Sequence, residues 1–198
     1  LGININTVPV LDLSRKNFHK IIGNRSYSSD PKKVSKIGNY CISMFKDNKI
    51  ATVMKHIPGH GLAKVDSHKK LPYVNNSLKY LYKNDFSVFK NKTCLFAMTA
   101  HIVFNKIDNK NCVTHSKKVI RIIRKKIGYK NIIISDDLSM KSLKYSMSVN
   151  TRKAFTAGCN LVLHCNGNFN EMLEVAKNSP LLNEFILKKT SKFINMIS

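Results

Sequence analysis

The chain has 198 residues, of which 43% are hydrophobic, and its 34 Lys and Arg residues against 11 Asp and Glu give a formal net charge of +23. This hydrophobic content argues against a disordered chain, and the length is sufficient for one domain with a buried core. No apolar run approaches the roughly 18–20 residues that a membrane-spanning helix needs, so we expect no membrane contact.

Five short apolar segments along the chain have the character of β-strands. Each of them is apolar almost without interruption, whereas a half-exposed strand alternates apolar and polar residues. Continuous apolar strands are typical of parallel sheets that are covered on both faces. The predicted strands are residues 3–11, 50–54, 94–98, 131–135 and 160–163.

Segments of helical length separate these strands, and several carry recognisable ends. Asp30 is placed as an N-cap with Pro31 at the first helical position, Ser116 is a second candidate cap, and Gly158 is suited to end a helix. The predicted helices are residues 31–47, 78–90, 116–127, 150–157 and 182–197.

The alternation of strands and helices predicts an α/β fold with a parallel sheet. A closed (β/α)₈ barrel has eight strands, and this chain offers about five, so we expect an incomplete TIM barrel that forms one catalytic domain over residues 1–198. About three strands would then precede Leu1, which also leaves a signal peptide undecided. Polar residues follow the strands, where barrels build their sites: Asp12, His56, His101, Asp136 and Asn166.

The first chemical motif is Lys55-His56-Ile57-Pro58-Gly59-His60-Gly61, which is followed by Asp66-Ser67-His68. An Asp and a His two residues apart in a loop can pair, and the carboxylate then orients the imidazole for general acid/base catalysis near neutral pH. A solvated loop with incidental polar residues is the alternative. The neighbouring Lys55, His56 and glycine-rich turn favour the catalytic interpretation.

A second motif, Asp136-Asp137, follows the strand at residues 131–135. One carboxylate could act as a nucleophile or stabilise positive charge, while the other could cap the following turn. Arg25 lies between the first strand and the first helix, where its planar fork of donors could bind a polar substrate or form a loop salt bridge.

Two other functions deserve weighing. The charge of +23 could indicate a nucleic-acid-binding protein, but the basic residues are spread along the chain and no Trp is present, which favours compositional bias. A zinc-dependent barrel hydrolase could use His56, His60, His68, His101 and Asp136, although Pro58 and Gly59 prevent the helix that would join His56 to His60. We expect no metal and no cofactor. The five Cys lack a Cys-x-x-Cys pair and are interpreted as free thiols in a reducing compartment.

The order of these motifs resembles glycoside hydrolase family 3, specifically its bacterial β-N-acetylhexosaminidases of the peptidoglycan-recycling type. The resemblance is carried by the two motifs above and by supporting matches that span nearly the whole chain. These matches are Pro9-Val10-Leu11-Asp12-Leu13, Arg25-Ser26-Tyr27 with Asp30-Pro31, Met98-Thr99-Ala100-His101 and Ala157-Gly158-Cys159-Asn160.

The resemblance implies a retaining, two-step glycosidase mechanism. In it Asp136 matches the nucleophile that forms a covalent glycosyl-enzyme intermediate, His68 matches the acid/base, and Asp66 matches its partner, on a loop that would close over the sugar. Arg25, Lys55 and His56 match residues that hold the N-acetylglucosamine unit. A histidine in place of the usual second carboxylate leaves phosphorolysis open as an alternative to hydrolysis.

The resemblance also implies a muropeptide substrate that contains N-acetylglucosamine, a cytoplasmic location, a monomer when full length, and no nucleic-acid partner. The Asp-Gln-Glu-Gly-Gly segment that the family carries upstream is absent from this sequence. We therefore expect an N-terminally truncated chain that is unstable and inactive by itself, because an open parallel sheet with exposed edges tends to aggregate.

Overall fold

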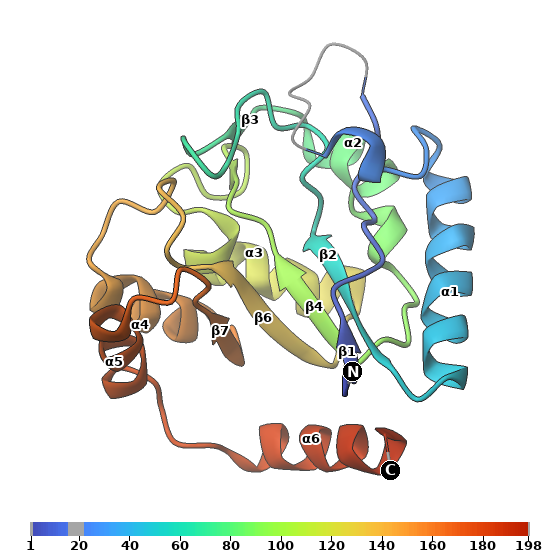
Figure 1. Cartoon of the computed structure of the whole chain (residues 1–198). Coiled ribbons are helices and arrows are strands. Elements are labelled where there is room, and N and C mark those ends of the chain that lie inside the picture. The colour runs from blue at the N-terminus through green and yellow to red at the C-terminus, as the bar shows by residue number, and fades with distance from the viewer. Residues whose placement is uncertain (1, 16–21, 198) are drawn as a thin grey trace.

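The computed structural model describes residues 2–15 and 22–197. Its centre is a parallel sheet of five strands in the order β1-β2-β4-β6-β7, which curves as half of a barrel (Figure 1). Every neighbouring pair in this sheet is parallel, which confirms the prediction of an incomplete (β/α)₈ barrel with about five strands. The strands are β1 (Ile5–Asn6), β2 (Ala51–Ile57), β4 (Phe96–Thr99), β6 (Ile132–Asp137) and β7 (Leu161–Leu163).

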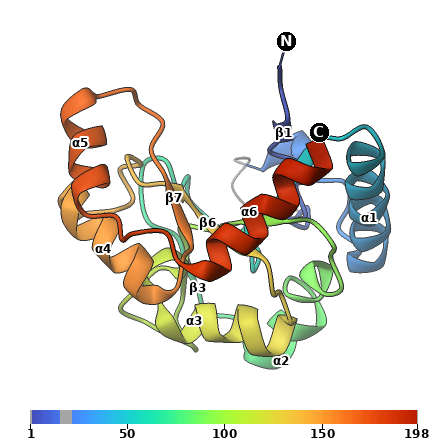
Figure 2. The ribbon, with the colours of Figure 1, turned by 90° about the horizontal axis from the view of Figure 1, so that it is seen from below.

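Helices connect consecutive strands, and the last helix crosses below the amino ends of the sheet (Figure 2). A separate small sheet pairs β3 (Tyr73–Val74) with β5 (Val103–Phe104) near the carboxyl ends of the main strands. The α-helices are α1 (Pro31–Asp47), α2 (Leu78–Lys83), α3 (Lys117–Ile122), α4 (Met147–Ala157), α5 (Phe169–Lys177) and α6 (Glu184–Ile197). A π-helical segment, Ile123–Ile127, continues α3, and short 3-10 turns lie at Gly23–Arg25, Ser87–Phe89 and Val113–His115.

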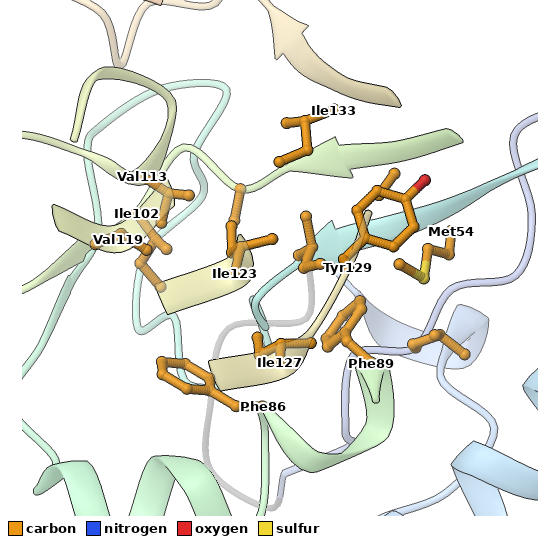
Figure 3. Packing of buried hydrophobic residues seen from close by; sticks show 14 of the residues in the cluster. Met54, Phe86, Phe89, Ile102, Val113, Val119, Ile123, Ile127, Tyr129 and Ile133 are labelled. Atoms are coloured by element: carbon orange, nitrogen blue, oxygen red, sulfur yellow. The ribbon is translucent and has the colours of Figure 1, made fainter. Parts of the chain in front are cut away.

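The two faces of the sheet belong to two different apolar clusters. Met54 and Ile133 lie in the larger cluster beneath the connecting helices (Figure 3), whereas their chain neighbours Val53 and Ile132 lie in a smaller cluster on the other face. Since successive side chains of a strand point to opposite faces, both clusters require apolar residues, and this explains the uninterrupted apolar runs.

Helix α6 covers part of the smaller cluster. The ring of Phe193 meets the ring of Phe96 edge to face, with 5.8 Å between the ring centroids, and Met196 packs against the same cluster. Edge-to-face aromatic pairs contribute about 0.5–1.5 kcal/mol beyond the area that they bury. The last helix therefore closes the amino-terminal end of the half-barrel.

The helix ends agree with the predictions from sequence. The Asp30 carboxylate accepts a hydrogen bond from the Lys32 N–H at 2.8 Å, and the Ser116 hydroxyl accepts one from the Val119 N–H at 3.2 Å. Gly158 ends α4 with φ of 114°, in the left-handed region that favours glycine. These contacts satisfy donors and acceptors that a helix end leaves unpaired.

Several predicted boundaries were wrong. The first strand is shorter than residues 3–11 because Pro9 has no N–H to donate, although the Leu11 N–H still donates to the Lys55 carbonyl at 2.7 Å. Residues 78–90 form a short helix and a separate 3-10 turn, since the backbone of Asn84 leaves the helical region. Helix α5 and the small sheet were not predicted. In the described part of the chain, no helix is long and apolar enough to cross a membrane.

The turn after β2 approaches the backbone at Leu13, in the segment after β1, so closely that only glycine fits. A Cβ on Gly61 would lie 2.3 Å from the backbone oxygen of Leu13, so a backbone shift would be unavoidable. We predict that Gly61→Ala lowers the free energy of unfolding by about 3 kcal/mol, as overpacking of a rigid site does. Urea denaturation followed by circular dichroism measures this loss.

The comparison variant is Gly167→Ala, which has backbone strain without a clash, whereas Gly61→Ala has a clash without a positive φ. Gly167 has φ of +74° and no atom within 4 Å of the added Cβ, so this variant isolates the backbone cost of about 1–2 kcal/mol. A Gly61→Ala protein that is at least as stable as Gly167→Ala would contradict the close approach.

Candidate active site

A cavity of about 350 Å³ opens at the carboxyl ends of the strands. Five of the six residues selected from the sequence line it: Arg25, Lys55, His56, His68 and Asp136. They come from segments up to 111 positions apart, and the parallel sheet brings them together because all its strands end at the same edge.

The buried carboxylate of Asp12 organises the end of β2 and the turn that follows it. It accepts the His60 N–H at 2.6 Å and the His56 N–H at 3.3 Å, and it pairs with His56 Nδ1 at 2.6 Å. Burial opposes ionisation of Asp12, but His56 and His60 outweigh it, and its pKa lies below the usual value. The ionised carboxylate can only accept, so Nδ1 of His56 donates and the other ring nitrogen remains for the cavity.

Asp12 also anchors the loop that carries Arg25. The hydroxyl of Ser26 donates to the backbone oxygen of Asp12 at 2.7 Å. Lys55 lies close enough to Arg25, Asp136 and Asp12 for their charges to affect it. Burial and the Arg25 charge lower the pKa of Lys55, while the two carboxylates oppose this shift. The two cations and Asp136 therefore share one electrostatic environment.

The backbone of Asp136 belongs to a chain of hydrogen bonds that runs through the end of β4, the 3-10 turn Val113–His115 and the segment after β4. Its N–H donates to Thr99 Oγ1 at 3.3 Å, Thr99 and Thr114 hydroxyls are 2.8 Å apart, and Thr114 Oγ1 lies 2.8 Å from His101 Nδ1. The second ring nitrogen of His101 lies 3.0 Å from the carbonyl oxygen of Asp137. Since a carbonyl only accepts, Nε2 carries the proton and the whole chain has one consistent direction of donation.

Burial and neighbouring groups together set the charge states of His101 and Asp136. Burial lowers the pKa of His101, which agrees with the neutral ring that the hydrogen bonds require. Burial also favours the neutral acid at Asp136, but His101, His56 and the Asp137 N–H outweigh it and hold the pKa of Asp136 below its usual value. The carboxylate that faces the cavity is thus ionised at neutral pH.

The adjacent Asp137 has a different set of contacts. Its Oδ2 accepts the Ser139 hydroxyl at 2.6 Å, and its Oδ1 accepts the N–H groups of Ser139 at 3.0 Å and Cys165 at 3.1 Å. These bonds tie the turn after β6 to the segment after β7. Of the two neighbouring carboxylates, Asp136 is therefore the better candidate for a nucleophile.

Asp66 and His68 form a local pair in the loop over the cavity. Asp66 Oδ1 lies 3.0 Å from His68 Nδ1 and accepts the His68 N–H at 2.8 Å. The His68 side chain is 65% exposed, whereas that of Asp66 is 23% exposed. The carboxylate fixes the ring through Nδ1, which leaves Nε2 as the nitrogen that can exchange a proton with a ligand.

His60 packs beneath this loop, where its Nε2 lies 3.0 Å from the Ser67 hydroxyl. Burial and the charge of His56 lower its pKa to about 4. The histidines that the sequence offered as zinc ligands therefore have protein partners, and no group of three possible ligands is placed for a metal ion within residues 2–15 and 22–197.

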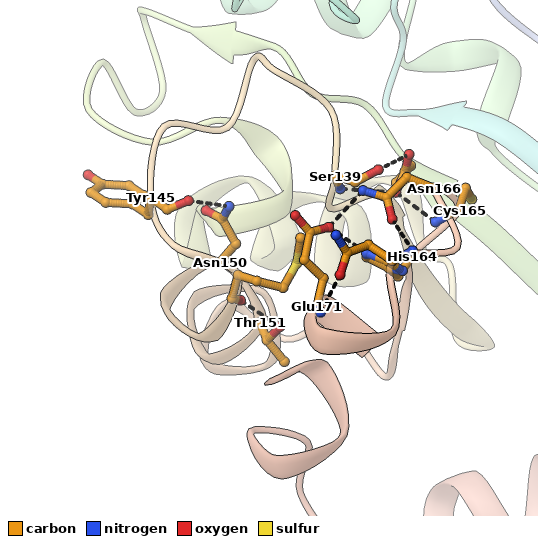
Figure 4. Close-up of polar contacts among 11 residues, drawn as sticks. Ser139, Tyr145, Asn150, Thr151, His164, Cys165, Asn166 and Glu171 are labelled. Carbon is orange, nitrogen blue, oxygen red and sulfur yellow. Dashed lines mark hydrogen bonds and ion pairs between the residues drawn. The ribbon is translucent and has the colours of Figure 1, made fainter. Parts of the chain in front are cut away.

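The segment after β7 forms the remaining wall of the cavity with Leu163 and Cys165. Next to it, Glu171 Oε2 lies 2.8 Å from His164 Nε2 and accepts the amide of Asn166 at 2.7 Å (Figure 4). Asn166 was predicted to point toward the shared site, but its amide is engaged by this helix residue instead.

Sequence reasoning selected the residues with reactive side chains and missed those that hold them. Asp12 and His101 were noted as polar residues at strand ends and within the family matches, and His101 was also weighed as a zinc ligand, but neither was selected as a site residue. A carboxylate between two leucines, as in Leu11-Asp12-Leu13, is a usable signal, because a charge among buried apolar residues requires partners. Thr99 was noted only within a family match, and nothing in the sequence marks Thr114.

Comparison with protein-family models matches residues 1–196 to the Glycosyl hydrolase family 3 N terminal domain. Among curated proteins, a beta-hexosaminidase of Photobacterium profundum is 32% identical over 207 residues, covering 100% of this chain and 61% of that protein. A beta-hexosaminidase of Neisseria meningitidis is 34% identical, covering 83% of this chain and 47% of that protein. The chain spans about half the length of the curated relatives it matches.

Solved structures agree with this assignment. A glycoside hydrolase family 3 beta-N-acetylglucosaminidase from Paenibacillus superposes with a TM-score of 0.86 at 26% identity, covering 98% of this chain and 40% of that one. Native NagZ from Neisseria gonorrhoeae gives a TM-score of 0.86 at 30% identity, covering 97% and 56%.

The buried His60 predicts a pH-dependent stability. Its folded pKa of about 4 lies below the ordinary value of 6.5, so the unfolded chain binds more protons and stability falls as the pH drops from 6.5 towards 4. When the pH is lowered from 7 to 4.5, the free energy of unfolding should fall by about 2 kcal/mol more in the protein with His60 than in His60→Gln. Urea titrations of both proteins at the two pH values measure it, and equal losses would contradict the assignment.

Proposed function

Because the chain belongs to glycosyl hydrolase family 3, we propose that it carries the reacting groups of a retaining β-N-acetylhexosaminidase that removes terminal β-linked N-acetylglucosamine. The proposal rests on one observation, which is that a carboxylate, two cations and two imidazoles line the same cavity. These residues are Asp136, Arg25, Lys55, His56 and His68, and Asp136 is ionised. A carboxylate nucleophile and a separate proton donor at one site are the groups that two-step glycoside hydrolysis requires.

In the first step Asp136 attacks the anomeric carbon, and the bond from that carbon to the leaving oxygen breaks. His68 delivers a proton from Nε2 to the leaving oxygen, while Asp66 stabilises the imidazolium through Nδ1. The charge that develops on the sugar ring is met by the Asp136 carboxylate. The bond that forms is an ester between Asp136 and the sugar.

In the second step neutral His68 accepts a proton at Nε2 from a water molecule, which attacks the anomeric carbon and releases Asp136. Two inversions at the same carbon retain the β configuration. The Asp136 N–H donates to Thr99 Oγ1, and the Asp136 carboxylate accepts the Asp137 N–H, so backbone and carboxylate are held in both steps and the leaving carboxylate does not have to reorient.

The sugar would be held by Arg25, Lys55 and His56. The Arg25 guanidinium offers several N–H donors in one plane, and Lys55 adds a compact cation beside it, so the hydroxyl and acetamide oxygens of the sugar would meet donors. His56 presents the ring nitrogen that Asp12 does not use. The Asp12 carboxylate keeps that ring in one orientation.

We further propose a muropeptide as the natural substrate, a cytoplasmic location and a monomeric full-length protein, each in keeping with the family resemblance. The muramyl and peptide carboxylates of such a substrate are anionic, and a chain with a net charge of +23 attracts anions from solution. A nucleic-acid partner has less support, because the relatives reported above are named as glycosidases.

Phosphorolysis is a second candidate, and the acid/base group favours considering it. An imidazole next to Arg25 and Lys55 does not repel a phosphate anion, whereas a second carboxylate would. Phosphate would then replace water in the second step and leave the sugar as a 1-phosphate.

We predict that Asp136→Ala, in the gene product that contains these 198 residues, lowers kcat/KM for a chromogenic N-acetyl-β-glucosaminide by at least about 10³-fold, as loss of a catalytic nucleophile does. Mass spectrometry with a fluorinated substrate that hydrolyses slowly should locate the sugar on Asp136. Asp137→Asn is the matched control, and a larger loss in this variant would reassign the nucleophile.

His68→Ala should lose more activity toward a disaccharide than toward the chromogenic substrate. A nitrophenolate leaves without protonation, whereas a sugar alkoxide needs the proton that His68 supplies. Asp66→Ala should show the same pattern more weakly. Equal losses on both substrates would remove His68 from the proton-donor role.

We predict that water, not phosphate, takes the sugar from Asp136 in the second step. With 10 mM phosphate (on the order of a high cellular concentration), we expect the product to be free N-acetylglucosamine, because His68 is placed to activate a neutral nucleophile. Mass analysis of the product decides this directly. Accumulation of the sugar 1-phosphate in proportion to added phosphate would establish phosphorolysis instead.

A further inference from the structure

A second cavity of about 490 Å³ lies between helices α3 and α4, outside the candidate active site. Lys117 and Lys118 contribute to it from the start of α3, and Arg152 and Lys153 contribute from the middle of α4. None of these four cations has a part in the proposed glycosidase chemistry.

The cavity wall holds more positive than negative charge. Arg152 Nη1 donates to Asn178 Oδ1, and Lys153 Nζ donates to Asn111 Oδ1 at 3.3 Å and lies 4.9 Å from the centroid of the Tyr145 ring. Within residues 2–15 and 22–197, none of the four cations forms an ion pair with a carboxylate. The one carboxylate in the wall, Asp108, is already occupied by the Ser116 hydroxyl at 2.7 Å and by the N–H groups of Lys110 and Asn111. A concave surface with several cations and one internally satisfied carboxylate concentrates small anions.

A buried, unsatisfied polar atom lies in the same wall. His115 lines the cavity, is 8% exposed, and has no hydrogen-bond partner for Nε2 in the described part of the chain. Burial lowers its pKa to about 3, and the neighbouring His101 and Lys153 further disfavour its protonated form. A bound anion would give Nε2 a hydrogen-bond partner, because it can accept from the protonated ring. It would also raise the pKa of His115 by offsetting the neighbouring cations.

We propose that this cavity is a binding site for a small tetrahedral oxyanion of the phosphate class, held by Lys117, Lys118, Arg152 and Lys153 with His115 at its wall. The guanidinium of Arg152 is suited to phosphate oxygens because its N–H donors match their spacing. The cavity is larger than one phosphate, so a phosphomonoester with a small organic part also fits.

The site adjoins the network that holds the candidate nucleophile. His115 follows Thr114, whose hydroxyl lies 2.8 Å from both Thr99 Oγ1 and His101 Nδ1. An anion that moves His115, or favours its protonated form, therefore acts one residue away from the groups that fix Asp136 and Asp137. This gives the anion a direct structural route to the catalytic edge of the sheet.

Calorimetric titration with inorganic phosphate, at ionic strength held constant with chloride, tests the site. We expect saturable binding that weakens at least about tenfold in Lys117→Ala/Lys118→Ala, because two charge-assisted contacts are lost. The control is Lys188→Ala/Lys192→Ala, which removes the same charge from exposed positions of α6. Non-saturable binding, or equal weakening in the control, would overturn the site in favour of diffuse attraction.

A parallel titration with a sugar phosphomonoester separates two sources of the same chemistry. Tighter binding of the ester identifies a phosphorylated metabolite as the ligand class, and equal or weaker binding identifies free phosphate. Arg25→Ala should leave both affinities unchanged, so that a result from this cavity is not confused with phosphate at the candidate active site.

Ring ¹⁵N chemical shifts report on His115 directly, with assignment from His115→Gln. We expect phosphate to shift the His115 resonances toward those of a protonated ring, and to shift the His101 ring in the same titration. No change at His115 would overturn its place in the site, and a change at His115 without one at His101 would overturn the route to the catalytic edge.

Discussion

The candidate site depends on one buried carboxylate. Asp12 is 1% exposed, yet it is ionised, because three hydrogen bonds from His56 in β2 and His60 in the turn after it replace the water that it has lost. An unpaired buried charge would cost several kcal/mol, so this arrangement stabilises the fold only with all its partners in place. The chemistry of the turn at His56–His60 is therefore coupled to the position of the first strand.

The same residue connects segments that differ in function. Through its carboxylate Asp12 fixes His56, and through its backbone oxygen it holds Ser26 next to Arg25. A second network, from Thr99 through Thr114 to His101, fixes the backbone of Asp136. Cations and nucleophile are thus positioned by separate buried networks, and each network is satisfied without a ligand. Such preorganised groups need little rearrangement when charge develops on a substrate.

The sequence predicted the parallel sheet and the reactive residues for reasons that are local. A run such as Ile132–Ile134 shows burial on both faces, and caps at Asp30 and Ser116 show where helices start. Helix α5 was missed although Asn168 caps it and Glu171 follows three residues later, a pattern that predicts a helix start. The small sheet of β3 and β5 could not be predicted, because strands of two residues leave no periodic pattern. Thr99 and Thr114 owe their role to the fold, which brings the end of β4 and the 3-10 turn Val113–His115 next to Asp136, and no local pattern records this.

His68 is more exposed and less firmly anchored than Asp136 and His56 of the candidate site. The groups that would hold the sugar and attack it are anchored in buried networks, whereas the imidazole is 65% exposed and is oriented by Asp66 within its own short loop. The proton donor must reach the leaving oxygen in one step and a water molecule in the next, so some mobility of its side chain is useful. The nucleophile, in contrast, must stay in one position. The local Asp66–His68 pair fixes the tautomer inside the loop, and within Asp66–His68 the buried Ser67 hydroxyl, 3.0 Å from His60 Nε2, connects the loop to the rest of the site. The division of the site into a rigid edge and an adaptable loop follows from where each hydrogen-bond partner lies in the sequence: distant for Asp136 and His56, and two residues away for His68.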